Sequence, residues 1–237
     1  MEMRFKIFRF DPETDEEPYY RNYTVVAEPQ ERILDCLNRI KWEQDGTLAY
    51  RMSCGHGVCG SDGMRINGVC GLACQKLVRE YEGLEIVLEP LPFFKVLKDL
   101  VVDMEHFLDG IRLIRPYLVS DSAPPEAERP QSPEDRKKVD DVIRCILCAC
   151  CTGSCPVMIQ NEKYVGPAAL VWAYRFIFDT RDDRYAERLK QIDFHDGAWS
   201  CVNFFECTRV CPKGIPVTKS INFLKREIQK AFPGRAG

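Results

Sequence analysis

The sequence predicts an α+β protein with two domains, a strand-rich domain over residues 1–100 and an all-helical domain over residues 101–237. Apolar residues alternate through much of the first domain, and they recur mainly at helical spacing in the second. A stretch with four prolines, residues 120–133, is typical of an exposed linker inside the helical part. The chain has 237 residues and 45% hydrophobic content, which is enough to build a core for each domain.

The first domain begins with a predicted strand–turn–strand hairpin, residues 4–10 and 19–27, joined by an acidic turn. A helix is expected over 31–42 because its apolar residues recur every three or four positions. A loop rich in Gly and Cys covers 51–74, and a closing strand is expected over 84–88. Together these elements predict a small ferredoxin-like α+β unit.

The second domain is expected to consist of helices. A run over 99–117 has near-helical spacing and ends at Pro116, and Ser132 marks the start of a helix that leads to Cys145. The apolar run 167–178 predicts a buried helix, and a last helix places Ile221, Leu224 and Ile228 on one side. Between them, residues 181–188 alternate acid and base and are expected to form a solvated face.

Composition excludes several classes of function. The net charge is −3 and no block of Lys or Arg stands out, so we expect no nucleic-acid partner. No secretory signal precedes the charged N-terminal strand, and the 13 cysteines are an odd number. These features favour a reducing compartment, where clustered thiols bind metal or carry out redox chemistry. The longest apolar stretch is about twelve residues and contains Arg175, which is too short and too polar to span a bilayer.

Two cysteine runs in the helical domain match the spacing of two-cluster bacterial ferredoxins, C-x2-C-x2-C-x3-C-P, in which the fourth cysteine ligates the other cluster. The first run is complete and ends at Pro156, whereas the second has Phe204 where its second cysteine should stand. Exchanging the fourth cysteines predicts a [4Fe–4S] cluster with four thiolates and a [3Fe–4S] cluster with three. The two predicted sets are Cys145, Cys148, Cys151 and Cys211, and Cys155, Cys201 and Cys207.

The N-terminal loop has the plant-type spacing of a [2Fe–2S] site, Cys54-x4-Cys59-x2-Asp62, followed by Cys74. Aspartate stands at the third ligand position and can coordinate iron, although it is harder than thiolate. Cys70 is the rival for this position. A Rieske site would need two histidines, and this loop contains only His56.

The other cysteines, Cys36, Cys70 and Cys150, are expected to be bystanders, and His106 and His195 are isolated. Structural zinc is the main competing chemistry, because Cys145-x2-Cys148 alone is a common zinc spacing. Zinc does not call for two interleaved C-x3-C-P ends and a plant-type loop as well. The spacing therefore favours three iron–sulfur clusters.

With these motifs in this order, the whole chain resembles the iron–sulfur subunit of succinate dehydrogenase and fumarate reductase, respiratory complex II. The resemblance rests on residues 51–63, on Ile66-Asn67-Gly68 before Leu72-Ala73-Cys74, on residues 99–104, and on both cysteine runs with Gly166-Pro167-Ala168-Ala169. Aspartate also occurs at the third [2Fe–2S] position within this family. The resemblance implies a plant-ferredoxin β-grasp domain followed by a helical domain like bacterial ferredoxin.

The resemblance also implies partners and a location. A flavoprotein subunit would hold FAD and the dicarboxylate site, and membrane-anchor subunits would bind quinone and, in some members, haem b. Electrons would pass from flavin through [2Fe–2S], [4Fe–4S] and [3Fe–4S] to quinone, at the cytoplasmic face of the bacterial cell membrane. No catalytic residue is expected in this chain, which lacks a Gly-rich dinucleotide fingerprint.

Five residues match family positions near quinone: Pro156, Ile159, Gln160, Val202 and Phe204. The chain departs from many ubiquinone-linked relatives here, which have Trp at the place of Ile159 or Gln160 and His at the place of Val202. Menaquinone is therefore open as the acceptor. Succinate oxidation is the first hypothesis for direction, fumarate reduction is its rival, and a free soluble ferredoxin with three clusters is the rival of a different class.

Overall fold

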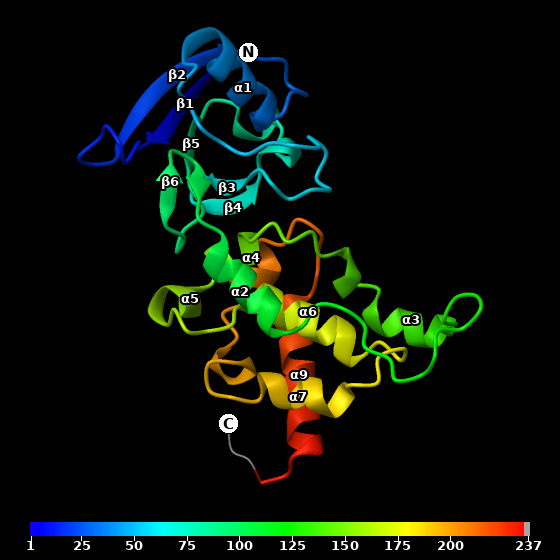
Figure 1. The fold of residues 1–237 in the computed structure, drawn as a ribbon. Helices are drawn as coiled ribbons and strands as arrows, with labels where there is room; N and C mark the ends of the chain where they lie inside the picture. Colours follow the sequence, from blue (N-terminus) through cyan, green and yellow to red (C-terminus); the bar gives the residue numbers. More distant parts are fainter. Residues whose placement is uncertain (235–237) are drawn as a thin grey trace. The chain divides into compact units, whose positions relative to one another are not determined.

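β1 (Glu2–Arg9) and β2 (Tyr19–Val26) pair antiparallel along their whole length, which confirms the predicted N-terminal hairpin. Every second side chain of β1 is buried, as expected for a strand with one face on the core: Met3, Phe5, Ile7 and Arg9. The structure is a computed structural model that describes residues 1–234, and Figure 1 shows its fold.

The sheet has five strands in the order β2-β1-β5-β3-β4. β5 (Glu85–Glu89) is the predicted closing strand and runs parallel to β1. β3 (Gly63–Ile66) and β4 (Val69–Leu72) form a hairpin inside the stretch that we expected to be a loop, so that expectation is wrong for residues 63–72. Asn67 and Gly68 turn between them with φ of 45° and 81°. Positive φ at both positions is what a two-residue Asn-Gly hairpin turn requires.

α1 (Ile33–Arg39) lies beside this sheet (Figure 1) and continues as a π-helical turn, Ile40–Gln44, which together confirm the predicted helix. Its buried residues are Ile33, Leu34, Cys36 and Leu37. Two short 3-10 helices follow the hairpin, Ala73–Gln75 and Val78–Tyr81.

The run 99–117 is not one helix, and that prediction is wrong at its N-terminal end. β6 (Val96–Lys98) and β7 (Val101–Val102) form a small antiparallel sheet, and α2 begins only at Glu105 and ends at Leu113. Asp99 turns between β6 and β7 with a φ of 46°. Its buried carboxylate accepts hydrogen bonds from Arg9, from the Phe10 N–H and from the Ala49 N–H. These long-range bonds hold the backbone in a conformation that a helix excludes.

The remaining helices confirm most of the predicted helical domain. Ser132 caps α3, its hydroxyl accepting from the Asp135 N–H at 3.0 Å, and the apolar residues of α6 and α9 are largely buried. Figure 1 shows α6, α7 and α9 lying together, and they pack on one another. The elements are α3 (Pro133–Val139), α4 (Cys150–Gly153), α5 (Pro156–Gln160), α6 (Pro167–Ile177), α7 (Tyr185–Ile192), α8 (Glu206–Arg209) and α9 (Val217–Ala231), with 3-10 helices Val142–Arg144 and Ala198–Ser200.

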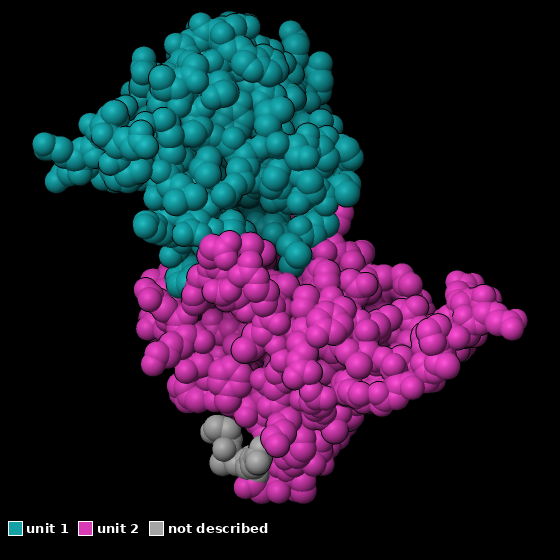
Figure 2. All heavy atoms as spheres, viewed as in Figure 1, with its two compact units in different colours: residues 1–104, 146–154 teal, residues 105–145, 155–237 magenta. Residues whose placement is uncertain are grey.

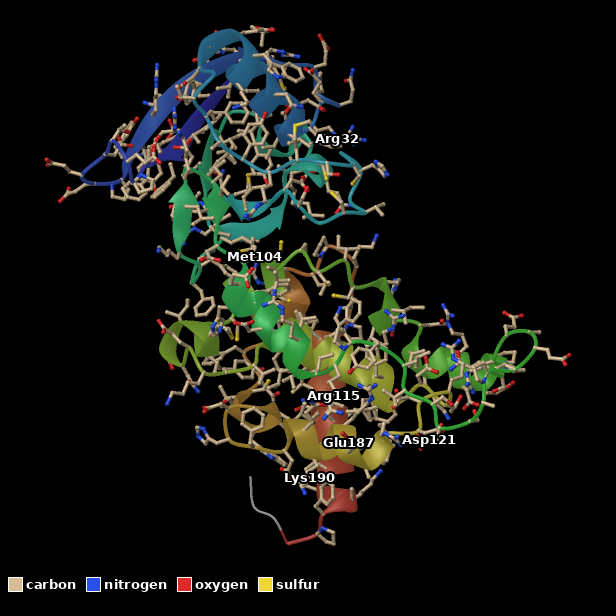
Figure 3. The ribbon with its side chains drawn as sticks, in the orientation of Figure 1. Arg32, Met104, Arg115, Asp121, Glu187 and Lys190 are labelled. Carbon is tan, nitrogen blue, oxygen red and sulfur yellow. The ribbon has the colours of Figure 1, made fainter. Side chains whose placement is uncertain are left out.

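The expected solvated face over 181–188 is wrong for two of its charged residues. Arg188 and Asp182 are both buried and form a two-pronged ion pair with N···O distances of 2.9 and 2.7 Å. The guanidinium also donates to the carbonyls of Ile114, Arg115 and Tyr117. Burial is tolerated because every charged group has a partner. Glu187 fits the prediction, since it is exposed and pairs with Arg115 at 2.7 Å (Figure 3).

The chain packs as two units, coloured separately in Figure 2. Unit 1 comprises Met1–Met104 and Ile146–Ser154, and unit 2 comprises Glu105–Cys145 and Cys155–Gly237. A mixed sheet dominates unit 1 and helices dominate unit 2, which confirms the α+β class. Among the described residues 1–234, no helix is both long enough and apolar enough to cross a membrane.

Candidate iron–sulfur centres

The loop from Cys54 to Cys59 turns its backbone N–H groups toward the Cys54 sulfur. The N–H groups of His56, Val58 and Cys59 lie 3.5, 3.4 and 3.2 Å from Sγ of Cys54. These hydrogen bonds, that of His56 foremost, lower the pKa of the Cys54 thiol to about 6. A thiolate, the form that binds iron, is therefore favoured at this position near neutral pH.

Glycine is required at two places in this loop. Gly57 has a φ of 73°, and a Cβ there would lie 2.2 Å from Nε2 of Gln75. Gly60 has a φ of 71°, and a Cβ there would lie 2.8 Å from the Ile146 carbonyl oxygen and 2.9 Å from Cβ of Cys148. The loop therefore packs with its backbone directly against the segment that carries Cys148, and both belong to unit 1.

Two short contacts link the other predicted ligands in pairs, Cys59 with Cys54 and Asp62 with Cys74. Sγ of Cys59 accepts from the Cys54 N–H at 3.5 Å and lies 3.2 Å from Oγ of Ser61. The Cys74 N–H donates to Oδ2 of Asp62 at 2.6 Å. Burial raises the pKa of Cys74 to about 12, so a nearby cation such as iron would be needed to hold it as thiolate at neutral pH. Unit 1 thus brings the four predicted [2Fe–2S] ligands onto one loop and its neighbouring 3-10 helix.

Asp62 carries an unpaired polar atom. Its residue is 2% exposed, and its Oδ1 is buried with no hydrogen-bond partner. Leaving a carboxylate oxygen buried and unpaired costs several kcal/mol unless a cation meets it. The donor set therefore fits a metal centre at Asp62. Its rival Cys70 lies on β4, opposite Arg65 in the hairpin, and is also buried.

A second pocket, entirely within unit 2, brings together Cys155, Cys201 and Cys207, the predicted [3Fe–4S] ligands. Burial raises the pKa of Cys155, and burial does the same for Cys207. Phe204 also lines this pocket, together with Thr218 on α9. Three thiols and an aromatic ring therefore share one cavity, as expected for a cluster with a missing fourth ligand.

The backbone of the two cysteine runs repeats. Leu147 and Ala149 have φ of 55° and 61°, and α4 follows. Asn203 and Phe205 have φ of 64° each, and α8 follows. Left-handed conformations are uncommon for residues other than glycine, so their recurrence at the same two places aligns the runs independently of the cysteines. In this alignment Phe204 occupies the place of Cys148, and Phe204 is 53% exposed.

The four predicted [4Fe–4S] ligands are divided between the two units. Cys148 and Cys151 flank the start of α4 in unit 1, and Cys145 ends the 3-10 helix Val142–Arg144 in unit 2. Sγ of Cys211 accepts from the Ile215 N–H at 3.4 Å. Their assignment to one cluster stays a prediction from the spacing.

The predicted bystander cysteines are all buried: Cys36, Cys70 and Cys150. Burial raises the pKa of Cys36 to about 12, which makes that thiol inert. Cys150 is a hydrogen-bond partner of Cys148, and this bond and burial raise its pKa well above the usual value. The histidines His56, His106 and His195 are exposed. Within residues 1–234, no three His, Cys, Asp or Glu side chains converge on one point as ligands of a single ion would.

The residues predicted near quinone lie in two groups. Pro156, Val202 and Phe204 line the pocket of the three thiols. Ile159 and Gln160 lie on α5 and are exposed, and they are not among the described residues that line this pocket. Sequence reasoning missed Phe205, which is exposed beside Phe204, and the hydroxyls of Ser61 and Thr218. No spacing rule marks such contacts, because they depend on packing between elements.

Comparison with known sequences places these centres in context. Residues 4–109 match a family described as "2Fe-2S iron-sulfur cluster binding domain", and residues 141–215 match a family described as "4Fe-4S dicluster domain". The chain is 42% identical over 229 residues to the succinate dehydrogenase iron–sulfur subunit of Coxiella burnetii, covering 95% of this chain and 97% of the relative. It is 41% identical over 224 residues to that of Paracoccus denitrificans, covering 94% and 86%.

Among solved structures, a chain of the Mycobacterium smegmatis Sdh1 complex in the apo form has a similar fold, with a TM-score of 0.84 and 25% identity over 99% of both chains. A hypothetical protein from Helicobacter pylori is similar at a TM-score of 0.59 and 18% identity. That similarity covers 94% of this chain and 39% of the other, and it concerns the fold alone.

Proposed function

Because the chain belongs to the iron–sulfur subunits of succinate dehydrogenase, we propose that it carries electrons from the FAD of a partner flavoprotein to membrane quinone through three clusters. The chain is thus part of an oxidoreductase and contains no complete active site of its own. Its residues bind the clusters, set their spacing and tune their potentials, while the clusters supply the one-electron chemistry.

The proposed [2Fe–2S] ligands are Cys54, Cys59, Asp62 and Cys74, in the domain 1–100. The unpaired Oδ1 of Asp62 and the N–H groups around Cys54 support this set. Iron bound at Asp62 would satisfy the buried oxygen, and the N–H groups would stabilise the negative charge on the sulfur. Cys70 lacks such an argument, although its thiolate would be the softer ligand.

The domain 101–237 is proposed to hold the other two clusters. The complete cysteine run supports a [4Fe–4S] cluster on Cys145, Cys148, Cys151 and Cys211. The three-thiol pocket supports a [3Fe–4S] cluster on Cys155, Cys201 and Cys207. Phe204 stands where a fourth thiolate would bind, and its aromatic ring cannot ligate iron.

The observation that carries the proposed electron path is the contact between the [2Fe–2S] loop and the first cysteine run. No side chain fits between Gly60 and Cys148, so a proposed ligand of the [4Fe–4S] cluster lies against the loop proposed to hold the [2Fe–2S] cluster. The same region of unit 1 contains a cavity of about 150 Å³, whose walls include Cys59, Asp62 and Cys148. Close packing of this kind would leave electrons a short path from one centre to the next.

The flavoprotein, the membrane anchor and the cytoplasmic face of a bacterial membrane are proposed as partners and location on the basis of family membership. Exposed apolar side chains that line the three-thiol pocket support an apolar neighbour there: Val202, Phe204 and Phe205. The same surface supports the proposal that quinone receives its electrons at the [3Fe–4S] cluster.

Purification of the native complex from membranes tests the proposal. We expect a flavoprotein to co-purify, EPR signals from all three clusters, and reduction of quinone by succinate. Assays with ubiquinone and menaquinone, in both directions, distinguish a succinate dehydrogenase from a fumarate reductase. Isolation of the chain as a stable monomer with three clusters and no flavoprotein would instead identify a free ferredoxin.

A further inference from the structure

A buried hydroxyl group lies against one of the proposed [3Fe–4S] ligands. Oγ1 of Thr218 is 3.4 Å from Sγ of Cys207, and Thr218 is 1% exposed. Thr218 is in the first turn of α9, Cys207 is on α8, and the two helices pack on each other within unit 2. Thr218 also lines the pocket of the three thiols. This hydroxyl is therefore excluded from water and lies close to the proposed cluster site. The packing of α9 on α8 holds it in position.

A second hydroxyl fixes the direction of the hydrogen bonds. Oγ1 of Thr208 lies 3.0 Å from Oγ1 of Thr218 and accepts from the Thr218 backbone N–H at 3.0 Å. A sulfur that ligates iron has no proton and can only accept. Each hydroxyl has one proton to donate. In its contact with Cys207 the Thr218 hydroxyl can therefore only be the donor, and the Thr208 hydroxyl can then donate to the Thr218 oxygen.

We propose that Thr218 is a positioning residue that donates a hydrogen bond to the ligand sulfur of Cys207 and thereby raises the reduction potential of the terminal cluster. This inference rests on the proposed function, because it requires a cluster at Cys155, Cys201 and Cys207. Reduction adds negative charge to the cluster and its sulfurs. A hydroxyl aimed at one of those sulfurs stabilises the reduced state more than the oxidised state.

Within residues 1–234, no hydroxyl contacts the sulfur of the other two proposed ligands of this site. Cys155 lies within hydrogen-bond reach of the backbone N–H groups of Val157 and Met158. Sγ of Cys201 faces Oδ1 of Asn203 at 3.7 Å, an acceptor that offers nothing to a thiolate unless its amide turns over. Two hydroxyls, those of Thr218 and Thr208, reach Cys207, and Thr218 is the stronger partner. Its removal would take away a donor without changing a ligand.

The test is a redox titration of the native complex, following the EPR signal of the oxidised [3Fe–4S] cluster. Thr218→Val removes the hydroxyl at nearly constant volume. We expect the redox equilibrium constant to fall about tenfold, which for one electron is a decrease of about 59 mV in midpoint potential. Thr218→Ser should restore the potential to near that of the wild type. An unchanged potential in Thr218→Val would overturn the inference.

Two further variants make the assignment specific. Ser220→Ala removes another buried hydroxyl of α9, one that donates to the Pro216 carbonyl at 3.2 Å, and should leave the potential unchanged. Thr208→Val should shift it less than Thr218→Val, because the Thr208 hydroxyl is the weaker of the two side-chain hydrogen-bond partners of Cys207. A larger shift in Thr208→Val, or an equal shift in Ser220→Ala, would show that Thr218 is not the donor.

If Thr218→Val does not assemble the cluster, the same redox titration is carried out on Thr218→Ala, which also lacks the hydroxyl, and its potential is compared with that of Thr218→Ser. Pulsed EPR in D₂O adds a readout that stability does not affect. Besides the exchangeable amide deuterons near Cys155, one further deuteron coupling should be present in wild type and absent in Thr218→Val or Thr218→Ala. Its persistence in both would overturn the inference. Absence of any [3Fe–4S] signal in the wild type would instead refute the proposed function.

Discussion

Among substitutions in unit 1 that remove one charge, we expect replacement of Arg9 to lower the free energy of unfolding the most. It is 4% exposed, and its guanidinium donates to Asp99 at 2.9 Å and to Asp45 at 2.5 Å. It also donates to the hydroxyl oxygens of Tyr23 and Thr47. These bonds tie β1 to the chain on either side of the [2Fe–2S] loop, so the change Arg9→Met affects both the fold and the position of that loop.

The expected cost follows from the two carboxylates left behind. Removing one partner of a buried ion pair typically costs about 3–5 kcal/mol, because the other charge stays buried without compensation. In Arg9→Met, the Asp45 carboxylate would still accept a hydrogen bond from Arg21 at 2.8 Å. The Asp99 carboxylate would still accept hydrogen bonds from two backbone N–H groups. We therefore expect a loss near the lower end, about 3 kcal/mol. The methionine side chain fills most of the space of the arginine stem, so a cavity contributes little.

Acid unfolding gives this prediction a second readout. Burial alone would raise the pKa of Asp45, but hydrogen bonds from Thr47, Tyr23 and Arg9 outweigh it and hold that pKa well below its usual range. Asp45 therefore contributes stability that is fully present above about pH 4, the pKa of an unfolded aspartate, and is lost as the pH falls toward the folded pKa. Arg9→Met should make stability less dependent on pH in this window.

The assay is urea unfolding of the purified complex at pH 7 and at about pH 3, below the pKa of an unfolded aspartate, monitored by circular dichroism and by cluster absorbance. Arg21→Met is the matched control, because Arg21 pairs with the same Asp45 carboxylate but its side chain is 53% exposed. An exposed partner of this kind is worth at most about 1 kcal/mol. Equal losses in Arg9→Met and Arg21→Met would refute the reasoning.

Three further substitutions test the cluster sites. Phe204→Cys should let the three-iron cluster gain a fourth iron, with loss of its [3Fe–4S] EPR signal; persistence of that signal alone would count against the alignment of Phe204 with Cys148. Asp62→Cys should keep a [2Fe–2S] cluster with an altered potential, and an unchanged potential in the EPR titration would argue against Asp62 as a ligand. Gly60→Ala should cost about 1–2 kcal/mol for its left-handed backbone alone, and more from the 2.8 Å approach to Ile146; full [2Fe–2S] occupancy with unchanged stability would contradict this.

The sequence predicts those helices whose buried face is marked by the spacing of nearby apolar residues. The buried faces of α6 and α9 follow from apolar residues at helical spacing, and both helices are confirmed. The β3–β4 hairpin had a local signal as well, because Asn67-Gly68 is flanked by alternating residues, but the density of Gly and Cys around it favoured a loop.

Long-range pairing accounts for the predictions that were wrong. Nothing near Asp99 in the sequence indicates that it meets Arg9, ninety positions earlier, and this pairing stops a helix from starting there. Asp182 and Arg188 read as surface charges because alternating signs are typical of a solvated helix face. Their burial depends on the carbonyls of residues 114–117, which complete the shell of Arg188.

The candidate ligands followed from cysteine spacing, because cluster geometry imposes the spacing on the chain. Cysteine spacing does not predict which side chains surround the ligands and form hydrogen bonds with them. Thr218 lies eleven positions after Cys207 and meets it only because α9 packs on α8. The unpaired oxygen of Asp62 is likewise a property of the folded loop, so the sequence left Asp62 and Cys70 as competitors.

The membership of Ile146–Ser154 in unit 1 has a consequence for synthesis on the ribosome. About forty residues of unit 2 separate this segment from Met104. At about 5–20 residues per second, the last part of unit 1 is made about 2–8 s after the rest of it. During that interval β4 lacks the helix α4 that packs on it, and Gly60 lacks Cys148. The first unit to emerge is therefore completed only when the first cysteine run has also been made.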